Sequence, residues 1–474
     1  MSTETSHLLE RNLNLLREAT ENSPYSHKLY LVGGLIRDRA LDQPLSNDVD
    51  IVLEGDALAL ATFLHKKRIT QHLPVTYPRF GTAMVHIGRQ GEEGLQVELV
   101  SARSESYLPD SRKPEVQKGT LQADAFRRDF TLNTLMQNLH SGEILDLTGK
   151  GWEDLKAGVI RTPLAPRLTF FDDPLRMLRA VRFSARFGFS IASETWEAIQ
   201  SEAYRLAPPT ISHERMREEF VKIALLSGKK FRLGMELLWD SGLLPQFLPE
   251  MIPMRGCTQG SWHAYDVWEH TLTALEALPQ TANLSVRLAL LWHDIAKPET
   301  RIVKGERRIA FPDHAPRGAE RAHEIMTRLK FPNEEIRAVT ALVGAHMRLG
   351  EYRAGWSDGT VRRLIRDTHT YLDDLFVLTE CDRSAVNIPS DIAADIEGLR
   401  TRIQQQNTLM DVAQVQSPLN GNEIMELLEI EPGIALKHAK EFLTNLILEG
   451  ELQEGDRHTA EVRLRAWWAS QDQH

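Results

Sequence analysis

The sequence has little cysteine, with only Cys257 and Cys381 among 474 residues. Two cysteines cannot build the disulfide framework of a small secreted domain, and their scarcity predicts a cytoplasmic protein. The N-terminus carries Glu4 and Glu10, which a secretory signal peptide would lack. No apolar run approaches the roughly 20 residues of a membrane-spanning helix, so we expect no membrane partner. Internal repeats and low-complexity tracts are also absent.

An excess of positive charge is lacking too, because 66 acidic residues outnumber 56 lysines and arginines and the net charge is −10. This balance argues against general affinity for nucleic acid but permits a local basic surface. Residues 174–193 contain no acid, and four arginines recur there at helical spacing. We expect either a groove for phosphates or a solvated helix face. The four are Arg176, Arg179, Arg182 and Arg186.

The hydrophobic content of 42% and the charged content of 26% are those of an ordinary globular protein with about three domains. Strand and helix patterns alternate over the first 100 residues, and after Gly151 almost every pattern is helical. We therefore predict an α+β fold in which a mixed part over residues 1–150 precedes a helical part. The expected strands are Leu29–Val32, Val49–Leu53, Ala83–Ile87 and Val97–Val100; the expected helices are Ala57–Lys67 and one beginning at Arg127; residues 101–124 are expected to form a long loop.

A glycine pair and an acidic pair lie close together in the first part. A predicted strand runs into Gly33-Gly34, where a turn without side chains and the start of a helix would let a phosphate approach the backbone. Asp48 and Asp50 are two apart on a predicted strand, so they point to one face and could hold Mg²⁺. Two such ions would clamp the attacking and leaving oxygens of a phosphoryl transfer. Glu98 is either a third carboxylate or an exposed strand residue.

A second group of chemically active residues lies between 263 and 382. An adjacent histidine and aspartate at the end of an apolar helix are costly to bury unless they are paired or bind a metal. Imidazole and carboxylate together suit Zn, Mn, Fe or Ni. The alternative is a set of capping and core histidines. The group contains His270, His293-Asp294 and Asp382, with His314 in an expected loop and His346 in an expected helix as further candidates.

The first half of the chain contains four motifs, which include the glycine pair and the acidic pair. They are Leu31-Val32-Gly33-Gly34-Leu35-Ile36-Arg37-Asp38, Asp48-Val49-Asp50, Arg127-Arg128-Asp129-Phe130-Thr131-Leu132-Asn133 and Asp172-Asp173-Pro174-Leu175-Arg176-Met177-Leu178-Arg179, with a helix-like 213–219 segment after them. Together they resemble bacterial class II tRNA nucleotidyltransferases, the CCA-adding enzymes, and the related poly(A) polymerases of the polymerase β superfamily. The His270, His293-Asp294 and Asp382 set resembles a fused HD phosphohydrolase domain.

The resemblance implies a polymerase-β-type head on 1–150, a helical nucleotide-recognition neck on 151–255, an HD-type domain on 256–385 and a helical tail on 386–474. It also implies roles for single residues. Asp48 and Asp50 would bind the catalytic Mg²⁺ ions, and His270, His293, Asp294 and Asp382 would bind a divalent transition metal. The nucleotide would be held by Gly33, Gly34, Arg37, Arg128, Asp129, Asn133, Asp173, Arg176 and Arg179.

Within this set, Asp173 and Arg176 would read the base. Three apart on one helix, they would face the same way. A carboxylate accepts from an exocyclic amino group and a guanidinium donates to a ring acceptor, so cytosine and adenine would be accepted. Uracil and guanine would be left with unpaired polar groups and be rejected. The alternative is an ordinary salt bridge along the helix.

The function implied is addition of C and A to the 3′ end of tRNA from CTP and ATP, with a possible phosphohydrolase activity at the HD site toward nucleotides or 2′,3′-cyclic phosphate ends. Residues 103–118 match the length of a loop that such enzymes need to add A, and Asp172 stands where the family often has Glu. Alternatives are a CC-adding or A-adding partial enzyme, a poly(A) polymerase, an HD phosphohydrolase whose first half is a nucleotide sensor, and a tRNA-binding protein without catalysis.

Overall fold

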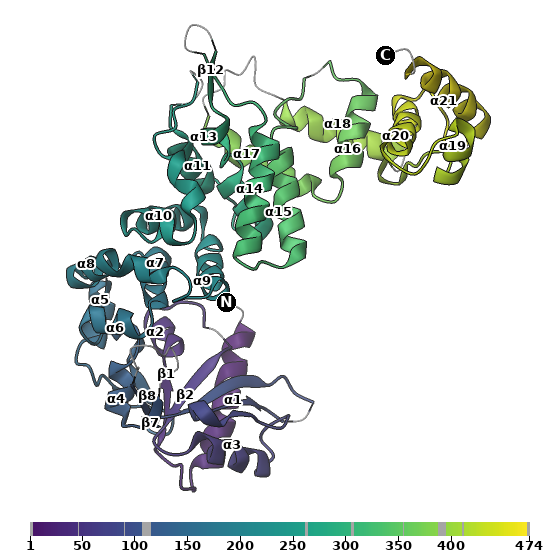
Figure 1. Cartoon of the computed structure of the whole chain (residues 1–474). Helices are drawn as coiled ribbons and strands as arrows, with labels where there is room; N and C mark the ends of the chain where they lie inside the picture. Colours follow the sequence, from purple (N-terminus) through teal and green to yellow (C-terminus); the bar gives the residue numbers. More distant parts are fainter. Residues whose placement is uncertain are drawn as a thin grey trace. The chain divides into compact units, whose positions relative to one another are not determined.

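The computed structural model describes residues 3–45, 47–89, 91–106, 115–260, 264–304, 308–353, 355–386, 395–409 and 412–471 (Figure 1). The chain folds into two compact units. Unit 1 comprises Met1–Ile223 and Leu233–Pro249, and unit 2 comprises Ala224–Arg232 and Glu250–His474. The finer division into four parts stays a prediction.

Unit 1 contains a mixed seven-stranded sheet in the order β3-β4-β5-β2-β1-β8-β9, which together with the helices confirms the α+β class. In Figure 1 the sheet lies near α1 and α3 at the purple and blue end of the chain. The strands are β1 (Leu29–Val32), β2 (Val49–Leu53), β3 (Val75–Tyr77), β4 (Thr82–Ile87), β5 (Leu95–Ser101), β8 (Met136–Asn138) and β9 (Ile144–Leu145); the first helices are α1 (Thr3–Thr20), α2 (Gly34–Ala40) and α3 (Ala57–Lys66).

Strand β2 crosses the centre of this sheet. It runs antiparallel to β1 and parallel to β5, and the register places Asp50 beside Val32 on one neighbour and Glu98 on the other. The apolar residues of β2 are buried while Asp50 is exposed, so one polar side chain projects from an otherwise apolar strand. Burial of the apolar residues fixes the register, because a shift by one residue would bury Asp50 instead.

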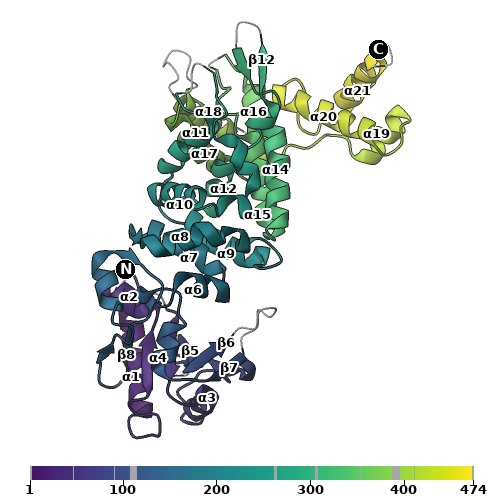
Figure 2. The same cartoon turned by 60° about the vertical axis from the view of Figure 1, so that its left-hand side comes forward.

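Two sequence-based expectations in this region are wrong. The expected loop at 101–124 contains an antiparallel hairpin of β6 (Arg103–Ser106) and β7 (Glu115–Lys118), followed by helix α4 (Leu121–Phe126), all visible in Figure 2. Residues 107–114 of that loop lie outside the described residues. No helix begins at Arg127; a short 3₁₀ turn, η2 (Thr131–Asn133), leads instead into β8.

The rest of unit 1 is helical, as expected, apart from one short parallel strand pair. The chain passes between the units within α9, within α10 and again between Pro249 and Glu250. The elements are α5 (Gly151–Ala157), β10 (Val159–Ile160), α6 (Pro166–Asp172), α7 (Leu175–Phe187), β11 (Ser190–Ile191), α8 (Ser193–Glu202), α9 (His213–Ala224) and α10 (Gly228–Asp240).

Unit 2 is almost wholly helical and contains one hairpin, β12 (Ile302–Lys304) with β13 (Arg308–Ala310). Its helices are α11 (Val267–Glu276), α12 (Leu284–Trp292), α13 (Lys297–Thr300), α14 (His314–Arg328), α15 (Asn333–Ala345), α16 (Asp358–Thr368), α17 (Leu372–Ser384), α18 (Ile396–Leu409), α19 (Gly421–Leu428), α20 (Ile434–Glu449) and α21 (Arg457–Gln471). Among the described residues, no helix combines the length and the apolar character that crossing a membrane requires.

Candidate active site and metal centre

The turn at Gly33 brings three of the sequence motifs together in unit 1. Gly33 has a φ of 71°, which side chains rarely tolerate, and it ends β1 and begins α2. A Cβ on Gly33 would lie 3.4 Å from Asp50 Oδ2 and 3.7 Å from Arg128 Nη1. A carboxylate and a guanidinium therefore flank a small space that only glycine leaves open.

Acidic residues cluster beside this space. Asp48 lies one residue before β2, and Glu98 pairs with Asp50 across the sheet. Although Asp50 as a residue is exposed, protein atoms around its carboxylate displace part of the water there. This loss of water first, and the nearby Glu98 second, raise the pKa of Asp50 to about 6, while Arg128 opposes the rise. Clustered carboxylates of this kind are stabilised by a cation, and hard divalent ions prefer oxygen ligands. The residues therefore fit the expected metal, with Glu98 as a neighbour that the sequence left undecided.

The Asp129 carboxylate connects the third motif to helix α7. It accepts hydrogen bonds from Asn133 Nδ2 at 2.9 Å and from Arg179 Nε at 2.8 Å and Nη2 at 2.6 Å. Burial acts to raise the pKa of Asp129, but the charge of Arg179 and the bond from Asn133 outweigh it and lower that pKa. Asp129 is therefore ionised and holds α7 in place.

Arg37 lies inside the protein, with only 4% of its surface exposed. Its Nη1 donates to Asn133 Oδ1 at 2.7 Å and its Nε to Asp38 Oδ1 at 2.7 Å, and its guanidinium stacks near the rings of Phe183 and Phe187. These contacts orient Asn133. A direct contact between Arg37 and a triphosphate stays a prediction.

The arginines of α7 are used inside unit 1. Arg179 pairs with Asp129, Arg182 with Glu219 at 2.6 Å, and Arg186 with Asp38 at 2.9 Å. These three guanidiniums have carboxylate partners within the protein, so they do not form a fully solvated helix face. A phosphate contact along this helix stays a prediction.

The predicted base-reading pair is not arranged along one helix. Asp173 has extended backbone between α6 and α7, and only Arg176 lies within α7. Arg176 Nη2 donates to the carbonyl of Arg127 at 2.7 Å. The Asp173 carboxylate accepts from Arg215 of α9 at 2.7 and 3.2 Å, a partner that the sequence did not indicate. The reading of bases by this pair stays a prediction.

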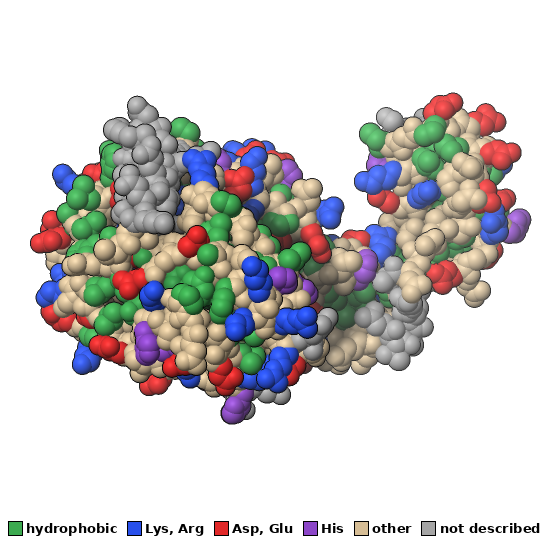
Figure 3. All heavy atoms as spheres, turned by 90° about the horizontal axis from the view of Figure 1, so that it is seen from below, with side chains coloured by type: hydrophobic (Ala, Val, Ile, Leu, Met, Phe, Trp, Pro, Cys, Tyr) green, Lys and Arg blue, Asp and Glu red, His purple; other side chains and the backbone are tan. Residues whose placement is uncertain are grey.

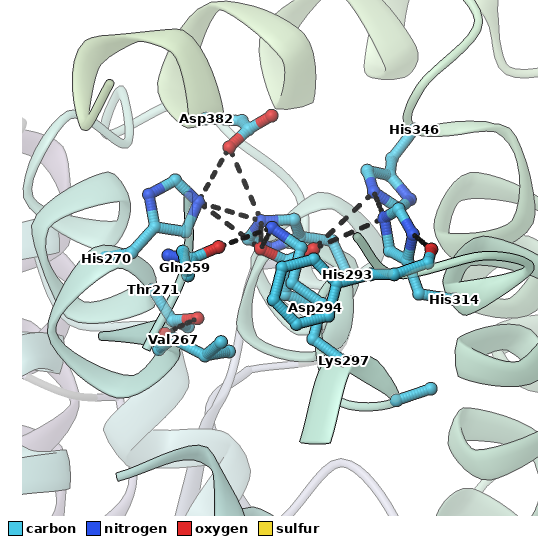
Figure 4. A network of polar contacts seen from close by, with 12 residues as sticks. Gln259, Val267, His270, Thr271, His293, Asp294, Lys297, His314, His346 and Asp382 are labelled. Atoms are coloured by element: carbon cyan, nitrogen blue, oxygen red, sulfur yellow. Dashed lines mark hydrogen bonds and ion pairs between the residues drawn. The ribbon is translucent and has the colours of Figure 1, made fainter. Parts of the chain in front are cut away.

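In unit 2 the predicted HD residues converge (Figure 4). His270 of α11, His293 at the end of α12 and Asp382 of α17 form one group, whose ligand atoms lie within 4.8 Å of one another. Asp294, His314 and His346 form a second group by the same measure. Asp294 also lies between the groups, with Oδ2 3.2 Å from His293 Nε2 and Oδ1 3.6 Å from His314 Nε2.

Three of these histidines are held in the same way. The Nδ1 atoms of His293, His314 and His346 lie 2.7–2.8 Å from the carbonyl oxygens of Leu290, Phe311 and Val343. Such bonds fix the ring and leave Nε2 for a metal. His314 is the first residue of α14, so its expected place in a loop is wrong. His346 directly follows α15.

The protonation of this centre fits a cation. Burial acts to lower the pKa of His293, but Asp294 and Asp382 outweigh it and raise that pKa to about 10. Burial and the charge of His293 lower the pKa of His346 to about 4, so its imidazole is neutral at pH 7. A positive charge is therefore favoured between the acids, and a neutral ligand stands beside them.

Comparison with known proteins supports both the head and the fold. Residues 29–161 match the poly A polymerase head domain, and residues 188–254 match the probable RNA and SrmB-binding site of polymerase A. The CC-adding tRNA nucleotidyltransferase of Thermus thermophilus is 33% identical over 74% of this chain and 78% of its own. The chain belongs to the tRNA nucleotidyltransferase family.

Two further relatives of this family differ in their printed activities or in length. The A-adding tRNA nucleotidyltransferase of Deinococcus radiodurans is 32% identical over 73% of this chain and 79% of its own. The mitochondrial CCA tRNA nucleotidyltransferase of Saccharomyces cerevisiae is 36% identical, but the match spans only 45% of that relative's length. The fold resembles that of the Bacillus stearothermophilus CCA-adding enzyme solved with CTP, with a TM-score of 0.67 and 20% identity over the full length of both chains.

Charge is mixed on the surface of this family member. On the face shown in Figure 3, lysines and arginines are interspersed with acidic and hydrophobic side chains among the described residues.

Proposed function

We propose that this chain adds C and A to the 3′ end of tRNA from CTP and ATP. The observation that carries the proposal is the juxtaposition of Gly33, Asp50 and Arg128, because a carboxylate for a metal and a guanidinium for phosphate flank a space without side chains. The 3′-hydroxyl of the RNA would attack the α-phosphorus of the nucleotide, and the bond to pyrophosphate would break.

The residues of unit 1 divide the work of this reaction. Asp48 and Asp50 would hold Mg²⁺, which when bound lowers the pKa of the attacking hydroxyl and neutralises pyrophosphate. Arg128 would neutralise the phosphates from the other side of Gly33. Asp173 and Arg176 would read the amino group and the neighbouring acceptor that cytosine and adenine share.

The comparisons do not distinguish a CCA-adding enzyme from one that adds only CC or only A. Relatives that are named CC-adding and A-adding are about equally similar to this chain, at 33% and 32% identity. We favour complete CCA addition because residues 103–118, the length of a loop associated with A addition, are present. A cytoplasmic location fits the buried free thiols Cys257 and Cys381, which a reducing compartment preserves.

One tRNA transcript ending in three ways, at the discriminator base, after C and after CC, tests the proposal. Each is incubated with Mg²⁺ and with CTP, ATP or both, and the products are sized on a gel. Extension to CCA is expected. Stopping at CC, adding a single A only to the CC end, or a long ladder with ATP alone would assign the chain as a CC-adding enzyme, an A-adding enzyme or a poly(A) polymerase. No extension would refute nucleotidyl transfer.

We also propose that unit 2 is a metal-dependent phosphohydrolase. Two groups of ligand atoms favour it, and they are adjacent because His293 of one group precedes Asp294 of the other. We infer one divalent transition metal for each group. When bound, such ions activate water and stabilise phosphate oxygens. Lys297, whose Nζ lies 2.7 Å from Asp294 Oδ2, adds a buried positive charge beside them. The expected substrates are nucleotide phosphomonoesters or 2′,3′-cyclic phosphate ends of RNA.

Elemental analysis of the purified chain, combined with a phosphohydrolase assay, tests this second activity. We expect about two transition-metal ions per chain and their loss, with the activity, in Asp294→Ala. His323→Ala is the matched control, because His323 lies exposed on α14, the helix that begins with His314. Absence of transition metal together with full activity in Asp294→Ala would refute the proposal.

A further inference from the structure

Asp124 is a buried carboxylate beside the nucleotide site that no sequence motif had singled out. It lies on α4, whose first turn is capped by Thr120. Leu121 and Ala125, on the same face as Asp124, pack into the core with residues of β1, β2 and β8. Asp124 is fully buried, so its carboxylate is held by a short helix that is itself anchored to the sheet.

The two oxygens of this carboxylate hold two neighbouring arginines. Oδ1 accepts from Arg127 Nε at 2.9 Å, and Oδ2 accepts from Arg128 Nη2 at 2.9 Å and Nε at 3.2 Å. Burial acts to raise the pKa of Asp124, but Arg128 and Arg127 outweigh it and lower that pKa. An ionised carboxylate therefore keeps two like-charged guanidiniums side by side, which a neutral side chain could not do equally well.

The two arginines lead to opposite ends of the proposed nucleotide site. Arg128 Nη1 lies beside Gly33 and Asp50, where phosphates would bind. The backbone carbonyl of Arg127 accepts from Arg176 Nη2 at 2.7 Å, and Arg176 is the guanidinium that would read the base. The Asp124 carboxylate thus positions the Arg128 guanidinium directly. It positions the Arg176 guanidinium through the backbone carbonyl of Arg127.

Asp124 also lies at the base of the β6–β7 hairpin. Strand β7 ends at Lys118, the amide of Gly119 donates to the carbonyl of Ala102, and Thr120 then caps α4. Strand β6 and helix α4 are in contact, so the hairpin packs against the helix that carries Asp124 (Figure 2).

We propose that Asp124 is a positioning residue for nucleotide addition, which presets Arg128 for the triphosphate and Arg176 for the base. The inference rests on the proposed function of unit 1. It assigns to one buried residue an effect on both affinity for the nucleotide and selection of the base, whereas the tRNA would be bound independently of it.

Steady-state kinetics of Asp124→Asn test the proposal. We expect KM for CTP and ATP to rise about tenfold, the loss typical of a weakened hydrogen bond between charged groups, with KM for tRNA unchanged. Discrimination against UTP and GTP should fall as well, because Arg176 loses its support. Asp146→Asn is the matched control, since Asp146 is a half-buried carboxylate of unit 1 that accepts hydrogen bonds from Thr148 Oγ1 at 3.0 Å and from the amide of Trp152 at 3.1 Å, outside the motifs. Loss of stability alone would affect both variants alike.

Asp124→Glu provides a second variant if the Asn variant does not fold. It keeps the charge and displaces both guanidiniums by the length of one methylene, so a smaller rise in KM for both nucleotides is expected. Unchanged nucleotide KM and unchanged base selection in a folded variant would overturn the proposal. Calorimetric binding of CTP without tRNA separates the proposed function of unit 1 from the role of Asp124. If the wild type neither binds CTP nor extends tRNA, both proposals fail. If the wild type is active and the variant has the same KM values and affinity for CTP, only the role of Asp124 is refuted.

Discussion

The two sites of this chain surround their acidic residues with different partners. In unit 1, arginines face the carboxylates of Asp124, Asp129 and Asp173, and the space beside Gly33 is framed by a carboxylate and a guanidinium. In unit 2, histidines surround Asp294 and Asp382, and their Nε2 atoms point to common centres. Arginine remains charged at all physiological pH values, whereas histidine can release its proton and bind a metal.

The difference in partners indicates that the two sites suit different ligands. Under the proposed function, permanent cations held by buried acids would form a frame for an anionic substrate, and a metal there would complete its shell with substrate phosphates. Imidazoles with fixed orientation would instead form a centre that holds its own ions. The two sites should therefore respond independently to substitution and to chelation. Two predictions test that independence, and two more test the arginine–carboxylate pairs of unit 1.

The largest effect is expected for Asp50→Asn. Removing one charge from the cluster of Asp48, Asp50 and Glu98 should lower nucleotide addition by roughly a thousandfold, because metal and positioning supply most of the rate. Transition-metal content and phosphohydrolase activity in unit 2 should stay at the wild-type level. Gel-based extension and elemental analysis of the same preparation measure both. Equal loss at both sites would show that the two are coupled.

His346→Ala should produce the next largest effect, confined to unit 2. The variant removes one ligand of the group with Asp294 and His314, so we expect one ion per chain in place of two and a loss of phosphohydrolase activity of about 10–100-fold. Extension of tRNA should not change. Two ions retained in the variant would mean that His346 is a core histidine, the alternative that the sequence left open.

The regular parts of both sites could be predicted from sequence. The bounds of β1 and β2 agree with those expected, since short apolar alternation between turns is a strong signal, and His270, His293, Asp294 and Asp382 do converge. In these cases each local choice agrees with the fold around it.

The partners of the charged residues could not be predicted in the same way. Arg179 and Asp129, and Arg215 and Asp173, are far apart along the chain, and no periodicity relates them. Asp124 is different, because it stands three and four residues before Arg127 and Arg128, a spacing that predicts ion pairs on a helix. The prediction of a loop over residues 101–124 conceals that signal, because ion pairs at this spacing depend on the helix that α4 forms.

Asp129→Asn tests how much the Asp129–Arg179 ion pair of unit 1 contributes to the free energy of unfolding. It leaves Arg179 with a weaker partner, so we expect the free energy of unfolding to fall by about 2 kcal/mol at pH 7. The pKa of Asp129 is lower in the folded state than in the unfolded chain, so its contribution is complete above about pH 4 and disappears as the pH falls below that value. The difference in stability between wild type and variant should therefore shrink in acid. Denaturant unfolding with a chelator present measures it. A difference that grows toward low pH would contradict the ion pair.

The smallest effect is expected for Arg215→Ala. Arg215 holds the Asp173 carboxylate with two hydrogen bonds, yet Asp173 also accepts from the backbone amide of Leu175, so it keeps part of its orientation. We expect rejection of UTP and GTP to weaken by only about three- to fivefold, within the range of a single lost contact. Competition assays with mixed nucleotides measure it, and Arg167→Ala, an exposed arginine of α6, is the control. If Arg215→Ala rejects UTP and GTP as well as the wild type does, then Asp173 is oriented without Arg215. The arginine–carboxylate pairs of unit 1 would then act on the phosphates rather than on the base.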